Sequence, residues 1–358
     1  MHKNSWDLLR LLAATLVLYS HQFALLGLPE PLFVGTATFG TAGVAIFFFL
    51  SGYLVWSSWE RDPNIWRFFL RRALRIFPAL WVVCLLSVFV LGPVATVLPI
   101  KSYFASDVTW RYLETAFLNL PRILPGIFLN SPFPQVVNGS LWTLPLEVLC
   151  YVSVLLVGLL CLVQKRWRIL TIGLCLSFFV LLASLGPQGV ADQFAPAMVL
   201  LARNVVEHFG FAYDRYASHY EMAAIFWWGV LYGALLTSPG KWGSPVVAGL
   251  VLLATVTAIL WSFERTALLV FVALAVHAAG RLAAGARLTE RLGDLSYGVY
   301  IVAFPVQQMG VQWGRAHGWN MATYFLTSFL ATYALAYLSW HAVEKRALLF
   351  KPKTKTAL

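Results

Sequence analysis

Residues 6–26 read WDLLRLLAATLVLYSHQFALL, an apolar stretch with the length that an α-helix needs to cross a bilayer. Similar stretches recur along the 358-residue chain, which is 60% hydrophobic and only 11% charged. This composition excludes an ordinary soluble protein, a disordered chain, a collagen and a coiled coil. The sequence therefore predicts an all-α fold, a polytopic membrane helical bundle.

We expect about ten transmembrane helices, separated by clusters of glycine, proline and charged residues. No internal repeat is visible, so we expect a single transmembrane domain over residues 1–350, followed by a basic cytoplasmic tail at 351–358. The expected spans are 6–26, 36–58, 76–98, 141–162, 169–186, 222–238, 244–262, 266–283, 295–314 and 320–341.

The distribution of basic residues predicts the orientation of these helices. If the N-terminus is cytoplasmic, nineteen of the 26 lysines and arginines fall on the inner side, which favours both termini inside. The same bias accounts for the formal net charge of +11 without a nucleic-acid partner. The four cysteines lie in apolar runs without metal-ligand spacing, so we expect no metal site.

Two ionisable residues occur inside the first expected span, Arg10 and His21. A charged group in hydrocarbon costs several kcal/mol unless it is paired or faces a cavity, which makes each a functional candidate. Their spacing places both on nearly the same face of a helix, about 16 Å apart along its axis.

A basic run, Arg71, Arg72 and Arg75, precedes the third expected span on the inner side. The planar guanidinium forks of arginine suit the binding of phosphate. An anchor for the inner leaflet explains the same charges equally well.

Glu147 lies near the outer end of the fourth expected span, at a depth similar to that of His21. A carboxylate beside an imidazole holds one tautomer and stabilises the imidazolium, as general-base catalysis on a hydroxyl requires. The alternative is a structural hydrogen bond between two helices.

Two further groups favour structural roles. The small residues in Ser51-Gly52-Tyr53 indicate close packing between helices. The pairs Glu264-Arg265 and Glu344-Lys345 are typical of ordinary turn or surface pairs.

Taken together, these residues resemble the acyltransferase-3 family of integral membrane acyltransferases over nearly the whole chain. Many relatives carry His-x-Pro after the last motif, where this chain has Ala303-Phe304-Pro305, so no catalytic role can be placed there. The motifs that carry the resemblance are Arg10 followed after ten residues by His21, the block Phe48-Phe49-Leu50-Ser51-Gly52-Tyr53, Arg72-x-x-Arg75, Trp142-x-Leu144-x-x-Glu147 and Ser296-Tyr297-x-x-Tyr300.

The resemblance implies transfer of an acyl group, commonly acetyl, from cytoplasmic acyl-coenzyme A to a hydroxyl of an extracytoplasmic or lipid-linked glycan. It implies acetyl-coenzyme A as donor and a multi-pass protein of the bacterial inner membrane. Some relatives append a hydrolase-like domain, which we do not expect in this chain. The implied roles are catalytic for His21, Glu147 and Arg10, cofactor-binding for Arg72, Arg75 and Arg71, and substrate-binding for Trp142, Tyr53 and Ser51.

Other functions are compatible with the same residues. A transporter or flippase of a lipid-linked sugar could use Arg10, His21 and Glu147 as a polar relay, but no inverted halves are visible. A third hypothesis is that the protein is a structural subunit of a glycan-assembly complex. For an acyltransferase, direct transfer and an acyl-histidine intermediate both stay open.

Overall fold

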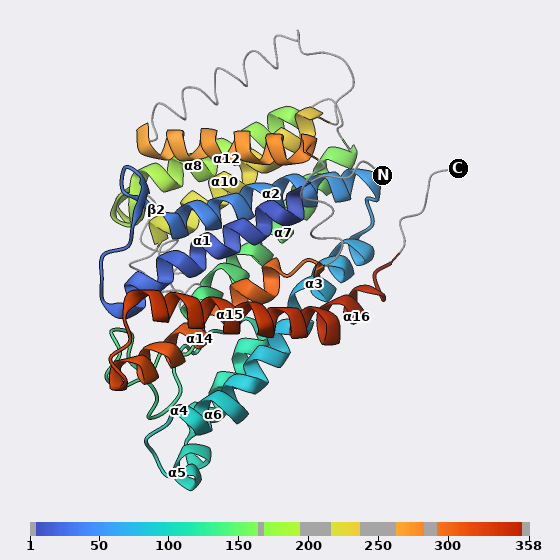
Figure 1. The fold of residues 1–358 in the computed structure, drawn as a ribbon. Helices are drawn as coiled ribbons and strands as arrows, with labels where there is room; N and C mark the ends of the chain where they lie inside the picture. The colour runs from blue at the N-terminus through green and yellow to red at the C-terminus, as the bar shows by residue number, and fades with distance from the viewer. Residues whose placement is uncertain (1–4, 164–167, 194–215, 237–262, 283–291, 353–358) are drawn as a thin grey trace. The chain divides into compact units, whose positions relative to one another are not determined.

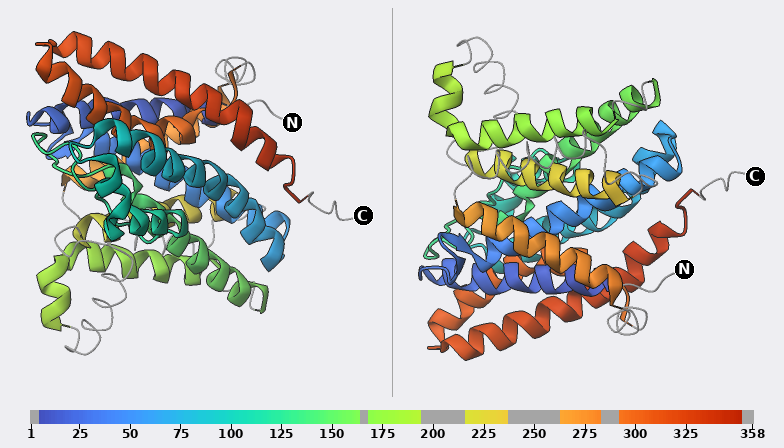
Figure 2. Two further views of the ribbon diagram at one scale, coloured as in Figure 1. Left: turned by 90° about the horizontal axis from the view of Figure 1, so that it is seen from below. Right: turned by 90° about the horizontal axis from the view of Figure 1, so that it is seen from above.

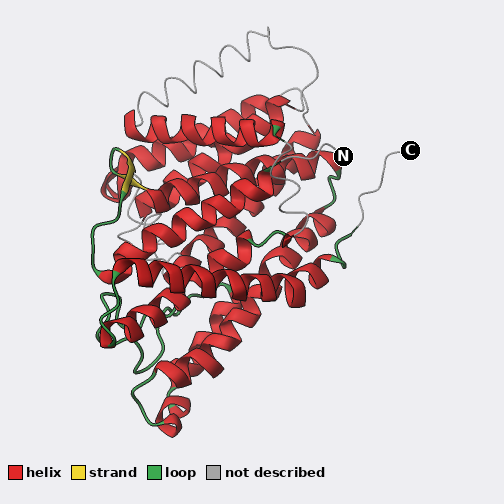
Figure 3. Ribbon diagram, in the orientation of Figure 1, coloured by secondary structure: helices red, strands yellow, loops and turns green. Residues whose placement is uncertain are grey.

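The computed structural model describes residues 5–163, 168–193, 216–236, 263–282 and 292–352. Most of this described part is helical (Figure 3). A short antiparallel hairpin of β1 (Leu32–Val34) and β2 (Ala37–Thr38) joins the first two helices. The predicted all-α bundle is confirmed.

Long helices dominate the chain, with short helical segments between and after them (Figure 1). The long helices are α1 (Trp6–Leu26), α2 (Phe39–Arg61), α3 (Ile65–Leu86), α7 (Thr143–Val163), α8 (Arg168–Gln193), α10 (Tyr216–Leu236), α12 (Phe263–Arg281), α14 (Ser296–Ala316) and α15 (Met321–Ser339). The short ones are the π-helix η1 (Ser87–Leu91), α4 (Gly92–Ala95), α5 (Ile100–Ala105), α6 (Asp107–Arg111), the 3-10 helices η2 (Tyr112–Phe117) and η3 (Gly139–Trp142), the π-helix η6 (Trp340–Glu344) and α16 (Lys345–Leu348).

Each expected span that falls on described residues overlaps one of the long helices, whereas the expected span 244–262 lies outside the described residues. The expected start of the third span was wrong, because α3 begins at Ile65 rather than near residue 76. The arginine-rich segment before residue 76 is itself a good helix former, and Pro78 lies inside the helix without ending it.

Several helices have the length and apolar composition of membrane spans, which confirms a membrane protein. Within the described residues, the stretches long and apolar enough to cross a bilayer are Trp6–Leu26, Phe39–Arg61, Ile65–Ala95, Gly139–Val163 and Met321–Leu348.

The described residues separate into two compact units that alternate along the chain. The first unit comprises those within Met1–Gly43, Leu70–Trp142 and Ala279–Pro352, and the second those within Val44–Phe69 and Thr143–Ala278. In the first unit, α14 packs against both α1 and α15 (Figure 2). In the second, α8 packs against α10 and α7. The expectation of one domain over 1–350 stays a prediction.

Backbone contacts define two ends of the first unit. At one end, the Ser5 amide donates a hydrogen bond to the Ala279 carbonyl, and the Ser5 hydroxyl donates one to the Leu282 carbonyl. The start of α1 therefore meets the end of α12. At the other, Gly27 lies beside Pro132, and Arg315 donates to the Asn130 carbonyl over 2.6 Å. We call these the Ser5 end and the Gly27 end.

The long connection between α3 and α7 is folded around a core of its own. Tyr103, Tyr112, Leu124 and Val137 are among its buried residues. The Tyr103 hydroxyl donates to the Val88 carbonyl over 2.9 Å. Hydrogen bonds then attach the last part of the connection, residues 130–142, to α14 at the Gly27 end.

Candidate functional site

His21 lies on α1 near the Gly27 end, and its ring meets Phe304 of α14 edge-on. The ring centroids are 5.4 Å apart with an interplanar angle of 81°. Phe304 in turn contacts Phe133 edge-on at 6.2 Å and is only 5% exposed. A Cβ atom on Gly139 would lie 2.7 Å from the Phe304 ring, so only glycine leaves room for it. The stretch without a predicted role, Ala303-Phe304-Pro305, therefore packs against His21.

Buried amides fix α14 beside the His21 segment. The Gln307 side chain donates to the Leu18 carbonyl over 2.9 Å and to the Gln22 amide oxygen over 3.1 Å. Gln308 donates to the carbonyl oxygens of Phe133 and Val136 over 2.9 and 3.0 Å. Buried amide groups are costly unless they are hydrogen-bonded. This network therefore restricts how α1, α14 and the connection can move around His21.

The turn that leads into α7 is also attached to α14. The Asn138 side chain donates to the Ile301 carbonyl over 2.7 Å, and the Tyr300 hydroxyl donates to the Ser140 carbonyl over 3.1 Å. These bonds place Trp142, which is partly buried, at the end of η3.

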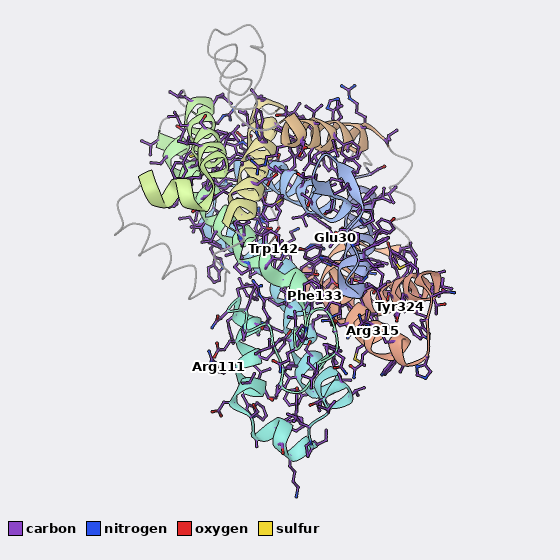
Figure 4. All side chains as sticks on the ribbon, turned by 90° about the vertical axis from the view of Figure 1, so that its left-hand side faces the viewer. Glu30, Arg111, Phe133, Trp142, Arg315 and Tyr324 are labelled. Atoms are coloured by element: carbon purple, nitrogen blue, oxygen red, sulfur yellow. The ribbon has the colours of Figure 1, made fainter. Side chains whose placement is uncertain are left out.

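The Gly27 end also carries an acidic residue. The Ser20 hydroxyl, next to His21 in the sequence, donates to the Glu30 carboxylate. Figure 4, which views this end, shows Glu30, Phe133 and Trp142 in its central part.

At the Ser5 end, the basic residues predicted for the donor meet a carboxylate that the sequence analysis did not single out. Asp294, just before α14, accepts hydrogen bonds from Arg75 over 2.6 Å and from Arg10 over 3.4 Å. It also accepts one from the Ser296 hydroxyl over 2.6 Å. Arg71 on α3 is 7% exposed. Arg10, on α1, is thereby joined to the arginine run of α3.

Two residues near the C-terminus complete this cluster. Glu344, expected at the surface, is 3% exposed and accepts a hydrogen bond from Ser339 over 2.9 Å. The surface-pair expectation was wrong because the π-helix η6 turns this carboxylate inward onto Gly298, whose Cβ would lie 3.2 Å from it. Partial desolvation lowers the pKa of Lys351, although this side chain is exposed, and the charges of Arg72, Arg75, Arg71 and Arg10 lower the pKa further. Lys351 therefore faces the same group of cations.

In the second unit, Glu147 is held by two hydroxyl groups. Ser51 donates to its carboxylate over 3.1 Å, and Tyr151 donates to the same oxygen. A Cβ atom on Gly52 would overlap the Phe226 carbonyl, which confirms close helix packing at Ser51-Gly52-Tyr53. The Tyr53 ring meets that of Tyr232 edge-on, with centroids 5.5 Å apart.

The structure thus divides the predicted site residues between the two units. The pairing of Glu147 with His21 stays a prediction, as do the individual catalytic and binding roles. The first unit holds Arg10, His21, Arg71, Arg72, Arg75 and Trp142, and the second holds Ser51, Tyr53 and Glu147.

In the first unit, α1 thus carries Arg10 in the basic cluster at the Ser5 end and His21 toward the Gly27 end. Residues 3–341 match the family model described as an acyltransferase domain. The chain belongs to this acyltransferase-3 family and is a membrane-bound acyltransferase.

Curated relatives match over almost their whole length. The chain is 32% identical to an "O-acetyl transferase" of Shigella phage Sf6, with 97% of each chain covered. It is 31% identical to "Nodulation protein 10" of Rhizobium leguminosarum bv. viciae, with 100% of this chain and 95% of the relative covered. No solved structure matches.

Proposed function

We propose that the protein moves an acetyl group from cytoplasmic acetyl-coenzyme A to a hydroxyl of an extracytoplasmic or lipid-linked glycan. One observation carries this proposal. Helix α1 bears Arg10, joined through Asp294 to Arg75, at the Ser5 end, and His21, packed on Phe304, toward the Gly27 end. The name of the phage relative, "O-acetyl transferase", supports acetyl as the transferred group.

The nucleotide phosphates of the donor would bind at the Ser5 end. Arg71, Arg72 and Arg75 supply guanidinium groups, which bind phosphate oxygens through charge-assisted hydrogen bonds. Lys351 adds a further cation there. A dense positive cluster of this kind favours a polyanionic ligand, such as the nucleotide part of the donor.

The pantetheine arm would follow the face of α1 that carries Arg10 and His21. These residues lie eleven positions apart in one continuous helix. The corresponding rise of about 16 Å is a length that an extended pantetheine can cover. The thioester would then lie beside His21 while its nucleotide stays at the basic cluster.

His21 would act as the general base in direct transfer. Its imidazole takes the proton of the acceptor hydroxyl while that oxygen attacks the thioester carbonyl. The carbon–sulfur bond then breaks, and the imidazolium returns the proton to the leaving thiolate. Glu147 would orient the ring. In the alternative, His21 itself attacks the thioester and the acyl-histidine then passes its acyl group to the hydroxyl.

The proposed location is the bacterial inner membrane, with both termini and the basic cluster on the cytoplasmic side. The excess of arginine and lysine at the Ser5 end supports this orientation, because basic residues favour the cytoplasmic ends of membrane helices. The glycan would then meet His21 from the opposite side.

The test uses purified full-length protein in vesicles with acetyl-coenzyme A labelled in its acetyl group and cell-envelope glycans as acceptors. We expect label in the glycan, and its release by mild alkali would identify an ester. Glycan that crosses the membrane without acquiring label would instead establish the transporter.

A further inference from the structure

Asp294 lies two residues ahead of α14 and uses its two carboxylate oxygens differently. Oδ1 accepts hydrogen bonds from the Ser296 hydroxyl over 2.6 Å and from the Ser296 amide over 3.3 Å. Oδ2 accepts from Arg75 Nη2 over 2.6 Å and from Arg10 Nη1 over 3.4 Å. One side chain therefore attaches the start of α14 to two arginines from α1 and α3.

The Asp294 carboxylate stays charged in this position. Burial alone would raise its pKa, but the charges of Arg75 and Arg10 and the hydrogen bonds from Ser296 lower the pKa below its ordinary value of 3.8. An anion between two guanidinium groups offsets their mutual repulsion. If that anion were removed, Arg10 and Arg75 would move apart.

Arg75 is held from a second direction by α14. Its guanidinium carbon lies 5.9 Å from the centre of the Tyr297 ring, a cation–π distance. The Tyr297 hydroxyl donates to the Ile76 carbonyl over 2.8 Å, which fixes that ring against α3. A guanidinium carries its N–H donors in a rigid planar fork, so holding one edge sets the direction of the others.

The other acidic residues at this end do not share this arrangement. The Asp7 carboxylate is 3.9 Å from Arg10 and half exposed. Glu344 uses one oxygen to accept from Ser339. Among the described residues, Asp294 is the carboxylate that bonds both Arg10 and Arg75.

We propose that Asp294 is a positioning residue for the acyl donor. It presets the guanidinium groups of Arg75 and Arg10 in the orientation that receives the nucleotide phosphates. The donor then binds without first having to order these two side chains, whose immobilisation would otherwise weaken affinity. This inference rests on the proposed use of acyl-coenzyme A.

The main test is Asp294→Asn in the full-length protein, with Asp7→Asn as the matched control. Calorimetry gives the Kd for acetyl-coenzyme A, and steady-state assays give KM and kcat. For Asp294→Asn we expect Kd and KM to rise roughly ten- to hundredfold, the effect of losing a charge-assisted hydrogen bond. We expect kcat to change by less than about threefold. Asp7→Asn should leave all three within about twofold.

A second donor separates positioning from a general structural role. Acetyl-pantetheine has the same thioester but no nucleotide phosphates, so Asp294→Asn should leave its kcat/KM unchanged. An equal loss with both donors would overturn the proposal, because the substitution would then have damaged the transfer step or the fold.

A double-mutant cycle tests whether Asp294 acts through Arg75. Once Arg75→Ala has removed the guanidinium, adding Asp294→Asn should raise the Kd for acetyl-coenzyme A little further. If the two substitutions instead raised Kd by factors that multiply, the proposal would be contradicted. If the unmodified protein binds acetyl-coenzyme A but does not acetylate glycan, the proposed function is refuted, while the Kd comparison still decides the role of Asp294. If the unmodified protein does not bind acetyl-coenzyme A, the proposed function and the role of Asp294 are both refuted.

Discussion

Gly139→Ala should disturb His21 through one intervening ring. The new Cβ atom would lie 2.7 Å from Cε2 and 2.8 Å from Cζ of Phe304, closer than a methyl group can approach. The ring must therefore move, and its edge-on neighbours are His21 and Phe133. Overpacking of this kind lowers the free energy of unfolding by about 1–3 kcal/mol. Gly139 does not need the left-handed conformation, so the methyl group itself is responsible.

The assay is the rate of acetyl transfer to glycan, measured alongside the thermal unfolding midpoint of the purified protein. We expect the rate to fall at least about tenfold, because small displacements of a reacting group are costly. Phe304→Leu shortens the side chain that meets the new methyl group. Adding it to Gly139→Ala should restore most of the lost rate and stability, since residues in contact are not additive.

A helical glycine of α14 serves as the control. A Cβ atom on Gly310 would lie 3.4 Å from the Ser328 hydroxyl, an ordinary contact, so Gly310→Ala should leave the transfer rate unchanged and should not lower the unfolding midpoint, because alanine favours a helix more than glycine does. Full activity of Gly139→Ala, or effects of Gly139→Ala and Phe304→Leu that simply add, would show that Phe304 does not link Gly139 to His21.

Three further predictions address the basic cluster and the helix contacts. Arg72→Ala should raise KM for acetyl-coenzyme A about tenfold or more with little change in kcat, as the loss of a phosphate contact would; an unchanged KM would mark Arg72 as a membrane anchor. The pKa of Asp294 is lower in the folded protein than its ordinary value of 3.8. The ionised carboxylate therefore stabilises the fold at every pH above 3.8, and this stabilisation is lost only as the pH falls through the lower, folded pKa. The difference in unfolding midpoint between the unmodified protein and Asp294→Asn should therefore stay constant from about pH 8 to pH 5, and a difference that shrinks within that range would contradict the assignment. Gly52→Ala, which brings a methyl group onto the Phe226 backbone, should lower the free energy of unfolding by about 1–3 kcal/mol or more, and calorimetry showing wild-type stability would disprove the close contact.

The sequence could predict the helices because a membrane span has a strong compositional requirement. Runs of apolar residues of sufficient length located α1 and α7 to within two residues. The start of α3 could not be found in this way, since Ile65 to Arg75 is helical but too polar to count as a span. Hydropathy detects only the part of a helix that is buried in lipid. A helix with suitable residues can continue past that part into a polar segment.

The sequence did not predict some residues of the site, for different physical reasons. Asp294 stands in a charge-rich connection, where an acidic residue is ordinarily solvated, and its partners on α1 and α3 are far away in the sequence. Glu344 is buried by a π-turn, which no simple periodicity reveals. Gln307 and Gln308 did leave a signal, because amides inside an apolar span must find partners.

In the proposed mechanism, His21 performs the transfer step while the basic cluster binds the donor. The most direct measurement compares His21→Ala with His317→Ala, a control at the exposed end of α14 whose ring lies 2.8 Å from the Trp313 carbonyl. For each variant, binding of acetyl-coenzyme A and acetylation of the glycan are measured on the same preparation. We predict that His21→Ala binds the donor normally and transfers no acetyl group, while His317→Ala does both. Glycan acetylation by His21→Ala at the unmodified rate would contradict the account.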